Sequence, residues 1–123
     1  MKIINKDSVT STNDELKLLA RDGAKSMTAL FAKTQTAGRG RHGREWESSQ
    51  GNLYGSILLR GVPKEKAHEL VYVAALAMVE TVESFLFDNE VTLKWPNDVL
   101  VDGKKLVAFY WKAKLKAANL SLL

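Results

Sequence analysis

Residues 91–106 read Val-Thr-Leu-Lys-Trp-Pro-Asn-Asp-Val-Leu-Val-Asp-Gly-Lys-Lys-Leu and indicate how the chain folds. Two runs typical of strands, residues 91–95 and 99–101, flank a Pro-Asn-Asp turn. The pair Asp102-Gly103 that follows is a strong hairpin signal leading into a further strand from Lys104. This stretch therefore predicts three neighbouring strands joined by tight turns.

The segments before this stretch alternate between helix and strand patterns. A long amphipathic helix is predicted from about Lys64 to Phe87, because apolar residues recur there at helical spacing. These residues are Val71, Ala74, Ala75, Met78, Val82, Phe85 and Leu86. Residues 27–34 and 52–60 read as strands, and residues 2–5 as a short strand or arm.

A first helix is predicted to open at Ser11-Thr12-Asn13-Asp14-Glu15. Thr12 and Glu15 fit a capping box, and Gly23 is a natural stop. Because strands come in neighbouring pairs with helices between them, the fold class is α+β, with a mixed or antiparallel sheet packed against helices.

The composition indicates one globular domain with one core. The chain has 123 residues, of which 46% are hydrophobic and 26% charged. It contains no cysteine, so a disulfide or zinc-thiolate site is excluded, and its two histidines lie far apart in the sequence. We find no signal peptide and no membrane-length apolar run, so we expect a soluble cytoplasmic protein without a membrane partner.

The net charge of +4 could indicate a nucleic-acid partner. However, much of the excess lies in a basic tail that contains Lys112, Lys114 and Lys116 and no acidic residue. A nucleic-acid binder usually shows a basic face with aromatic stacking residues, or a known module, and neither is evident here. We therefore expect no nucleic-acid partner.

Residues 35–46, Gln-Thr-Ala-Gly-Arg-Gly-Arg-His-Gly-Arg-Glu-Trp, form a segment rich in glycine and arginine. Glycine allows backbone N–H groups to approach a ligand closely, and arginine offers planar charged groups suited to phosphate or carboxylate. The segment is therefore predicted to be an anion-holding loop. A solvated, mobile basic loop is the alternative.

Four blocks in this order resemble the biotin protein ligases, also called biotin-[acetyl-CoA-carboxylase] ligases. They are Ser11-Thr12-Asn13, the loop at 35–46, Lys94-Trp95-Pro96-Asn97-Asp98, and Asp102-Gly103-Lys104-Lys105-Leu106. The resemblance implies a fold like that of class II aminoacyl-tRNA synthetases and biotin synthetases. It also implies ATP-dependent formation of biotinyl-5′-adenylate and transfer of biotin to a lysine of a biotin carboxyl carrier protein.

The resemblance also implies a role for individual residues. Those that it places on biotin or its adenylate are Ser11, Thr12, Asn13, Gln35, Gly38, Arg39, Gly40 and Arg41. Trp46 is implied on the adenine side, although a tryptophan after a loop is often a core anchor. For Thr12, simple capping of a helix is an equal alternative.

The remaining implied roles concern the phosphates. Arg41, Arg44 and Lys105 are the implied catalytic residues, and the resemblance also implies that Lys105 neutralises the reacting biotin carboxylate and the α-phosphate. Asn97 is implied near the phosphates and Asp98 on Mg²⁺, a metal that is often held through one or two carboxylates. Asn-Asp after proline is also ordinary turn chemistry, and Lys105 alone reads as a solvated hairpin residue.

The resemblance ends near Leu106, so residues 1–106 are predicted to be the N-terminal part of a ligase catalytic domain and residues 107–123 a divergent tail. No N-terminal DNA-binding domain and no C-terminal barrel are expected. Ala108–Lys112 can be encoded by bases that read Ile-Leu-Leu-Glu in a shifted frame, as the family would have there. We hypothesise a frameshift near codon 107, which the coding DNA tests directly; truncation by design or in nature is the alternative.

A shortened chain would keep most biotin contacts and lose distal ATP contacts, so full turnover is not expected. An uncovered sheet edge would favour a homodimer. The alternatives are a non-catalytic biotin- or carrier-binding fragment, a lipoate ligase-like protein, and a basic phosphate or nucleic-acid binder.

Overall fold

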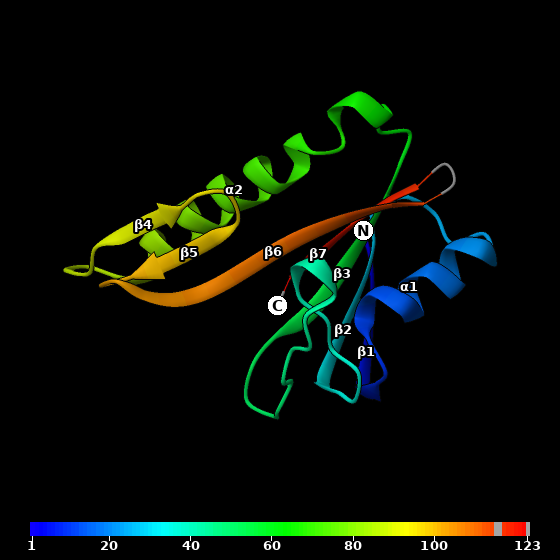
Figure 1. The fold of residues 1–123 in the computed structure, drawn as a ribbon, viewed down its shortest axis with the longest axis horizontal. Coiled ribbons are helices and arrows are strands. Elements are labelled where there is room, and N and C mark those ends of the chain that lie inside the picture. The colour runs from blue at the N-terminus through cyan, green and yellow to red at the C-terminus, as the bar shows by residue number, and fades with distance from the viewer. Residues whose placement is uncertain (115–116, 123) are drawn as a thin grey trace.

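The computed structural model describes residues 1–114 and 117–122, and it describes the side chains of residues 1–109. Within these residues, seven strands form a sheet in the order β1-β2-β3-β7-β6-β5-β4 (Figure 1). The elements are β1 (Lys2–Val9), α1 (Thr12–Arg21), β2 (Thr28–Gln35), β3 (Tyr54–Arg60), α2 (Glu69–Phe85), β4 (Val91–Lys94), β5 (Asp98–Val101), β6 (Lys104–Lys114) and β7 (Ala117–Leu122). Short 3₁₀ turns occupy Arg41–Gly43 and Lys64–Lys66.

Strand β6 joins two halves of the molecule. Its first half pairs antiparallel with β5, and its second half pairs antiparallel with β7. On the β7 side, β3 and β2 continue the sheet with antiparallel pairing, and β1 pairs parallel to β2 at the edge. Figure 1 shows α1 beside β1–β3 and α2 beside the β4–β5 hairpin, with β6 running between the two ends.

The buried apolar residues form two clusters, so the prediction of a single core is wrong. The first lies between α1 and the β1–β3 strands and contains Val9, Leu16, Leu30, Ala32 and Leu58. The second lies between α2 and the β4–β6 strands and contains Val71, Ala75, Val99, Val107 and Phe109. Each helix buries its apolar stripe against its own part of the sheet.

The predicted strands and helices are present, with shifts at their ends. The first helix begins at Thr12 but is capped by Ser11, whose Oγ accepts a hydrogen bond from the Asp14 N–H at 3.4 Å. The Thr12–Glu15 capping box is therefore wrong by one residue. The predicted apolar stripe of α2 also ends early, because Phe85 is 79% exposed.

Strand β6 crosses Leu106, where the divergent tail is predicted to begin. Val107 and Phe109 are buried in the α2 cluster, and the backbone of residues 117–122 pairs with β3. The described part of the tail is thus strand, whereas the domain boundary and the frameshift stay predictions. In the described part of the chain, neither helix combines the length and apolar character needed to cross a bilayer.

Candidate functional site

The N-terminus of α1 and the end of β2 meet in a buried polar cluster. Ser11, Thr12 and Asn13 are each 1% exposed, and Gln35 at the end of β2 is 8% exposed. The Thr12 N–H donates to Gln35 Oε1 at 2.9 Å. The structure therefore brings together four of the residues for which the family resemblance implies contact with biotin or its adenylate. Thr12 belongs to this cluster, and the cap of the helix is Ser11.

Two serines that the sequence analysis missed complete this cluster. Ser56 on β3 shares a hydrogen bond of 2.8 Å with Thr12 through their hydroxyl oxygens. Ser48 Oγ accepts from Gln35 Nε2 at 3.0 Å and donates to the Trp46 carbonyl at 3.1 Å. A signal for Ser56 existed, because a single hydroxyl within an apolar strand must find a buried partner.

Gly38 lies against this cluster so tightly that only glycine fits. A Cβ at this position would lie 2.4 Å from Ser48 Oγ and 2.6 Å from the Trp46 carbonyl oxygen. The Trp46 N–H in turn donates to the Gly38 carbonyl at 2.9 Å. The glycine of the loop thus serves close approach between two backbone segments, as expected for a position where a Cβ has no space.

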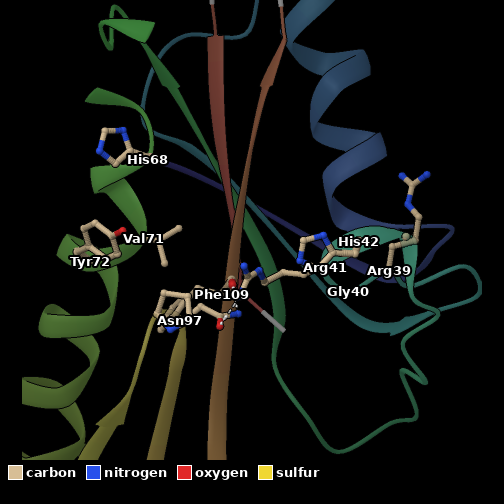
Figure 2. Close-up of a pocket in the computed structure, with 11 residues that line it drawn as sticks. Arg39, Gly40, Arg41, His42, His68, Val71, Tyr72, Asn97 and Phe109 are labelled. Carbon is tan, nitrogen blue, oxygen red and sulfur yellow. Dashed lines mark hydrogen bonds between the residues drawn. The ribbon is translucent and has the colours of Figure 1, made fainter. Parts of the chain in front are cut away.

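The side chain of Arg39 points toward α1 (Figure 2). Its guanidinium forms an ion pair with Asp14, which also pairs with Lys17 at 2.9 Å. Burial acts to raise the pKa of Asp14, but the hydrogen bonds from Lys17 and Arg39 outweigh it and leave that pKa below its ordinary value. Arg39 Nε is buried without a hydrogen-bond partner among the described residues.

Arg41 connects the glycine/arginine loop to the Pro-Asn-Asp turn. Its Nη1 donates to Asn97 Oδ1 at 3.2 Å, across 56 positions of sequence (Figure 2). Asn97 is itself fixed by β6, because its Nδ2 donates to the Phe109 carbonyl at 2.8 Å and its carbonyl accepts from the Phe109 N–H at 2.9 Å. The loop can reach this turn because His42 and Gly43 adopt positive φ angles of 57° and 72°.

The Arg41–Asn97 contact borders a cavity of about 380 Å³ between the loop and α2. Residues 39–43 form one wall, and His68, Val71 and Tyr72 form the opposite wall. The ring of Trp95 stacks on that of Tyr72, with the ring centroids 4.6 Å apart. The cavity thus combines a cationic wall with an aromatic one, which suits a planar anionic ligand.

Lys105 and Asp98 form an ion pair on neighbouring strands, with Nζ and Oδ2 3.0 Å apart. The pairing of β5 with β6 shifts between Val99 and Leu100, which leaves Leu106 as an extra residue. A bulge of this kind turns the following side chains to the other face of a strand. Without it, Lys105 would lie on the face opposite Asp98.

The other predicted site residues lie away from the buried cluster and from the Arg41–Asn97 contact. Trp46 and Lys105 line a second cavity of about 420 Å³ with Tyr54 and Met78, apart from the Arg41–Asn97 cavity. Arg44 is exposed on the loop. The described residues contain no group of three or more His, Cys, Asp or Glu side chains placed to hold a metal ion.

The model of the biotin/lipoate A/B protein ligase family matches residues 6–117 of this chain. The chain belongs to this family. Its fold agrees with solved structures of biotin protein ligases, in line with the predicted synthetase-like α+β class. The biotin protein ligase of Leishmania major in complex with biotinyl-5-AMP superimposes with a TM-score of 0.87 at 26% identity, over 98% of this chain and 56% of that one.

Other members of the family show higher sequence identity. The ligase of Aquifex aeolicus in complex with biotin and ATP has a TM-score of 0.82 at 32% identity, over 98% of this chain and 50% of that one. The bifunctional ligase/repressor BirA of Bacillus spizizenii is 39% identical over 107 residues, which are 85% of this chain and 33% of BirA. The biotin–[acetyl-CoA-carboxylase] ligase of Paracoccus denitrificans is 40% identical over 98 residues, which are 78% of this chain and 40% of that protein. The chain therefore spans about a third to two fifths of the length of these curated relatives.

Proposed function

We propose that this chain forms part of a biotin protein ligase that activates biotin with ATP and passes it to a lysine of a biotin carboxyl carrier protein. In the first step, the biotin carboxylate attacks the α-phosphorus of ATP, a P–O bond forms, and pyrophosphate leaves. In the second, the lysine amine attacks the acyl carbon and AMP leaves. Such chemistry needs the reacting anions held in line and their charge offset, more than it needs covalent help from the protein.

The observation that carries this proposal is the Arg41–Asn97 contact at 3.2 Å. It joins the anion-holding loop to the turn that the family places near the phosphates. A cation held in a cavity between two segments can offset the developing charge on a transferring group. Arg41 is therefore assigned to the phosphates, with Asn97 as the group that orients it.

The buried cluster of Thr12, Gln35 and Ser56 is assigned to the biotin head group. Its amide and hydroxyl groups can match the N–H and C=O groups of a ureido ring. The dithiolane ring of lipoate offers no comparable hydrogen-bonding groups, and buried polar groups left unmatched reduce affinity. This is the reason to favour biotin over lipoate as the substrate.

Asp98 supports a limited role for magnesium. Its Oδ2 is held by Lys105, and its side chain is only 12% exposed. One carboxylate fits a magnesium ion that keeps most of its waters and arrives with the ATP phosphates. We assign Asp98 to hold such an ion from the protein side, where the ion would supply charge neutralisation, and Lys105 to contact the biotin carboxylate and the α-phosphate.

Three further points belong to the proposal. The carrier protein is a partner by the family's chemistry, since curated relatives are named biotin–[acetyl-CoA-carboxylase] ligases. A cytoplasmic location is compatible with the cysteine-free composition. We also keep the prediction of a homodimer, which light scattering at several protein concentrations would test.

The proposal is tested by titration calorimetry with biotin, alone and with ATP and Mg²⁺, together with an assay for pyrophosphate release. We expect heat from biotin alone and tighter apparent binding with ATP. Biotin binding without pyrophosphate would favour the non-catalytic binding fragment. Tighter binding of lipoate than of biotin would favour a lipoate ligase-like protein, and no heat from either would overturn the proposal.

The assignment of Arg41 to the phosphates is tested by the variant Arg41→Ala, with Arg21→Ala as its control. Both variants remove one positive charge from an exposed side chain, but Arg21 lies in the last turn of α1 and outside the loop. We expect Arg41→Ala to abolish the effect of ATP and to leave biotin binding within about threefold, since a phosphate contact is lost rather than a head-group contact. Equal losses in the two variants would contradict the assignment of Arg41.

A further inference from the structure

We propose that Ser48 is a positioning residue that fixes the Gln35 amide for recognition of a cyclic urea. This inference rests on the proposed function, because it concerns how the same site selects its ligand. Ser48 is 6% exposed and lies two residues after Trp46, outside every block that carries the family resemblance. It contacts Gln35 and Trp46, for both of which the family resemblance implies a role in the site.

The directions of the hydrogen bonds around Gln35 are fixed by two backbone groups, one of which can only donate and the other only accept. The Thr12 backbone nitrogen can only donate, so the Gln35 atom 2.9 Å from it must be the carbonyl oxygen Oε1. The Trp46 carbonyl can only accept, so Ser48 must use its single proton there, at 3.1 Å. The Ser48 oxygen is then left to accept from Gln35 Nε2, at 3.0 Å.

These contacts hold both the oxygen and the nitrogen of the Gln35 amide. Each atom makes one hydrogen bond to the described residues. An amide oxygen can accept two hydrogen bonds and an amide nitrogen can donate two. With respect to the part of the chain that the structure describes, one acceptor site on Oε1 and one proton on Nε2 therefore remain for a ligand. A cyclic urea presents an N–H beside a C=O, which matches such an acceptor and donor pair.

Ser48 also ties the amide to the end of the glycine/arginine loop. Its carbonyl accepts from the Gln35 backbone N–H at 3.4 Å, and its hydroxyl is within 2.4 Å of the position where a Gly38 Cβ would lie. Replacing Ser48 with alanine keeps the backbone contact but removes the anchor of Nε2. The amide could then rotate about its terminal torsion, which is intrinsically broad.

The test is a double-mutant cycle read by biotin calorimetry on the full chain. We expect Ser48→Ala to weaken biotin binding by about tenfold in the native background, the size expected for one lost buried hydrogen bond. In a Gln35→Ala background, the same change should alter affinity by less than about twofold, because Ser48 acts through Gln35. Ser49→Ala is the matched control, since its side chain is exposed and it should bind biotin like the unmodified chain.

Equal losses from Ser48→Ala in both backgrounds would overturn the proposal, as would unchanged affinity in the native background. If the unmodified chain binds no biotin, the proposed function fails and this inference fails with it. A measurement on the unmodified, ligand-free chain covers the case in which Ser48→Ala does not fold. A nuclear Overhauser effect between the Gln35 side-chain amide protons and the Ser48 β-protons is expected, and its absence would overturn the positioning role.

Discussion

The two halves of the molecule hold their polar site residues in opposite ways. At the α1 end, Ser11, Thr12, Asn13 and Ser56 are each 1% exposed, and Thr12 and Ser56 share a hydrogen bond of 2.8 Å. At the α2 end, the Lys105 side chain is 46% exposed, and the hydrogen bond from Arg41 to Asn97 is exposed to solvent. A buried polar group depends on its protein partners for hydrogen bonds, whereas an exposed cation stays hydrated and its ion pair is screened by solvent. The comparison predicts that substitutions at the α1 end cost stability and those at the α2 end cost little.

Gly38→Ala is expected to have the largest effect. Its new Cβ would lie 2.6 Å from the Trp46 carbonyl oxygen, and backbone cannot move aside cheaply. We expect the free energy of unfolding, measured in urea, to fall by about 3 kcal/mol. Gly40→Ala is the control, since its Cβ would meet Trp46 Cε3 at an ordinary 3.5 Å and should change stability by less than about 0.5 kcal/mol. Similar losses of unfolding free energy in the two variants would contradict the difference between the buried polar cluster and the rest of the glycine/arginine loop.

Thr12→Val comes next. It removes the 2.8 Å hydroxyl bond to Ser56 and puts a methyl group in its place, so we expect a loss of about 2 kcal/mol in urea unfolding. Thr10→Val is the control on an exposed neighbour and should be close to neutral. The double variant Thr12→Val with Ser56→Ala should recover part of the loss, because both polar partners are then gone. A larger loss in the double variant would argue against this pairing.

Lys105→Met tests the α2 end. The buried Asp98 carboxylate loses a partner 3.0 Å away, but the half-exposed lysine contributes only a partly screened interaction. We expect a loss of about 1 kcal/mol in thermal or urea unfolding. The adjacent variant Lys104→Met removes the same charge from an exposed position and serves as the control. A cost above that of Thr12→Val would reverse the comparison between the two ends.

Asp14→Asn should have a smaller, pH-dependent effect. Because the folded-state pKa of Asp14 is lowered from 3.8, its stabilising contribution is present above that value and is lost as the pH falls through the folded pKa. With its side chain partly exposed, we expect a contribution below about 1 kcal/mol. Urea unfolding at about pH 7 and about pH 3 should therefore show the variant and the native chain converging at the lower pH. A constant difference between them would exclude this linkage.

Asp102→Asn is the matched change at the α2 end and is expected to have the smallest effect. The hydrogen bond from Asn89, followed by that from the Glu90 N–H, lowers the pKa of Asp102, so the same loss on acidification applies. The group is fully exposed, and asparagine tolerates the positive φ of 49° found there. A loss of stability larger than that of Asp14→Asn in the same pH series would contradict the ranking.

Local patterns in the sequence predicted the elements well because their signals are local. The Asp102-Gly103 hairpin, the α2 periodicity and the strand at residues 27–34 each depend on neighbouring residues. The cap of α1 was placed one residue late, because Ser11 and Thr12 are both good caps and only the position of the helix axis distinguishes them. Ser48 was missed because its role depends on a residue 13 positions earlier in the chain.

The sequence by itself determined the family and the fold class, since these follow from motifs and from periodic burial. It also singled out Ser11, Thr12, Asn13 and Gln35, but not Ser48 and Ser56, which lie beside them in the structure. Only the tertiary structure decided which cations face which partners. A bulge between β5 and β6 turns Lys105 onto the face of Asp98, and the path of the loop sends Arg39 to Asp14 but Arg41 to Asn97. The physical reason is that neighbouring residues in the sequence do little to fix the direction of a long charged side chain. Their positions are set by strand register and loop geometry, which depend on contacts between distant parts of the chain.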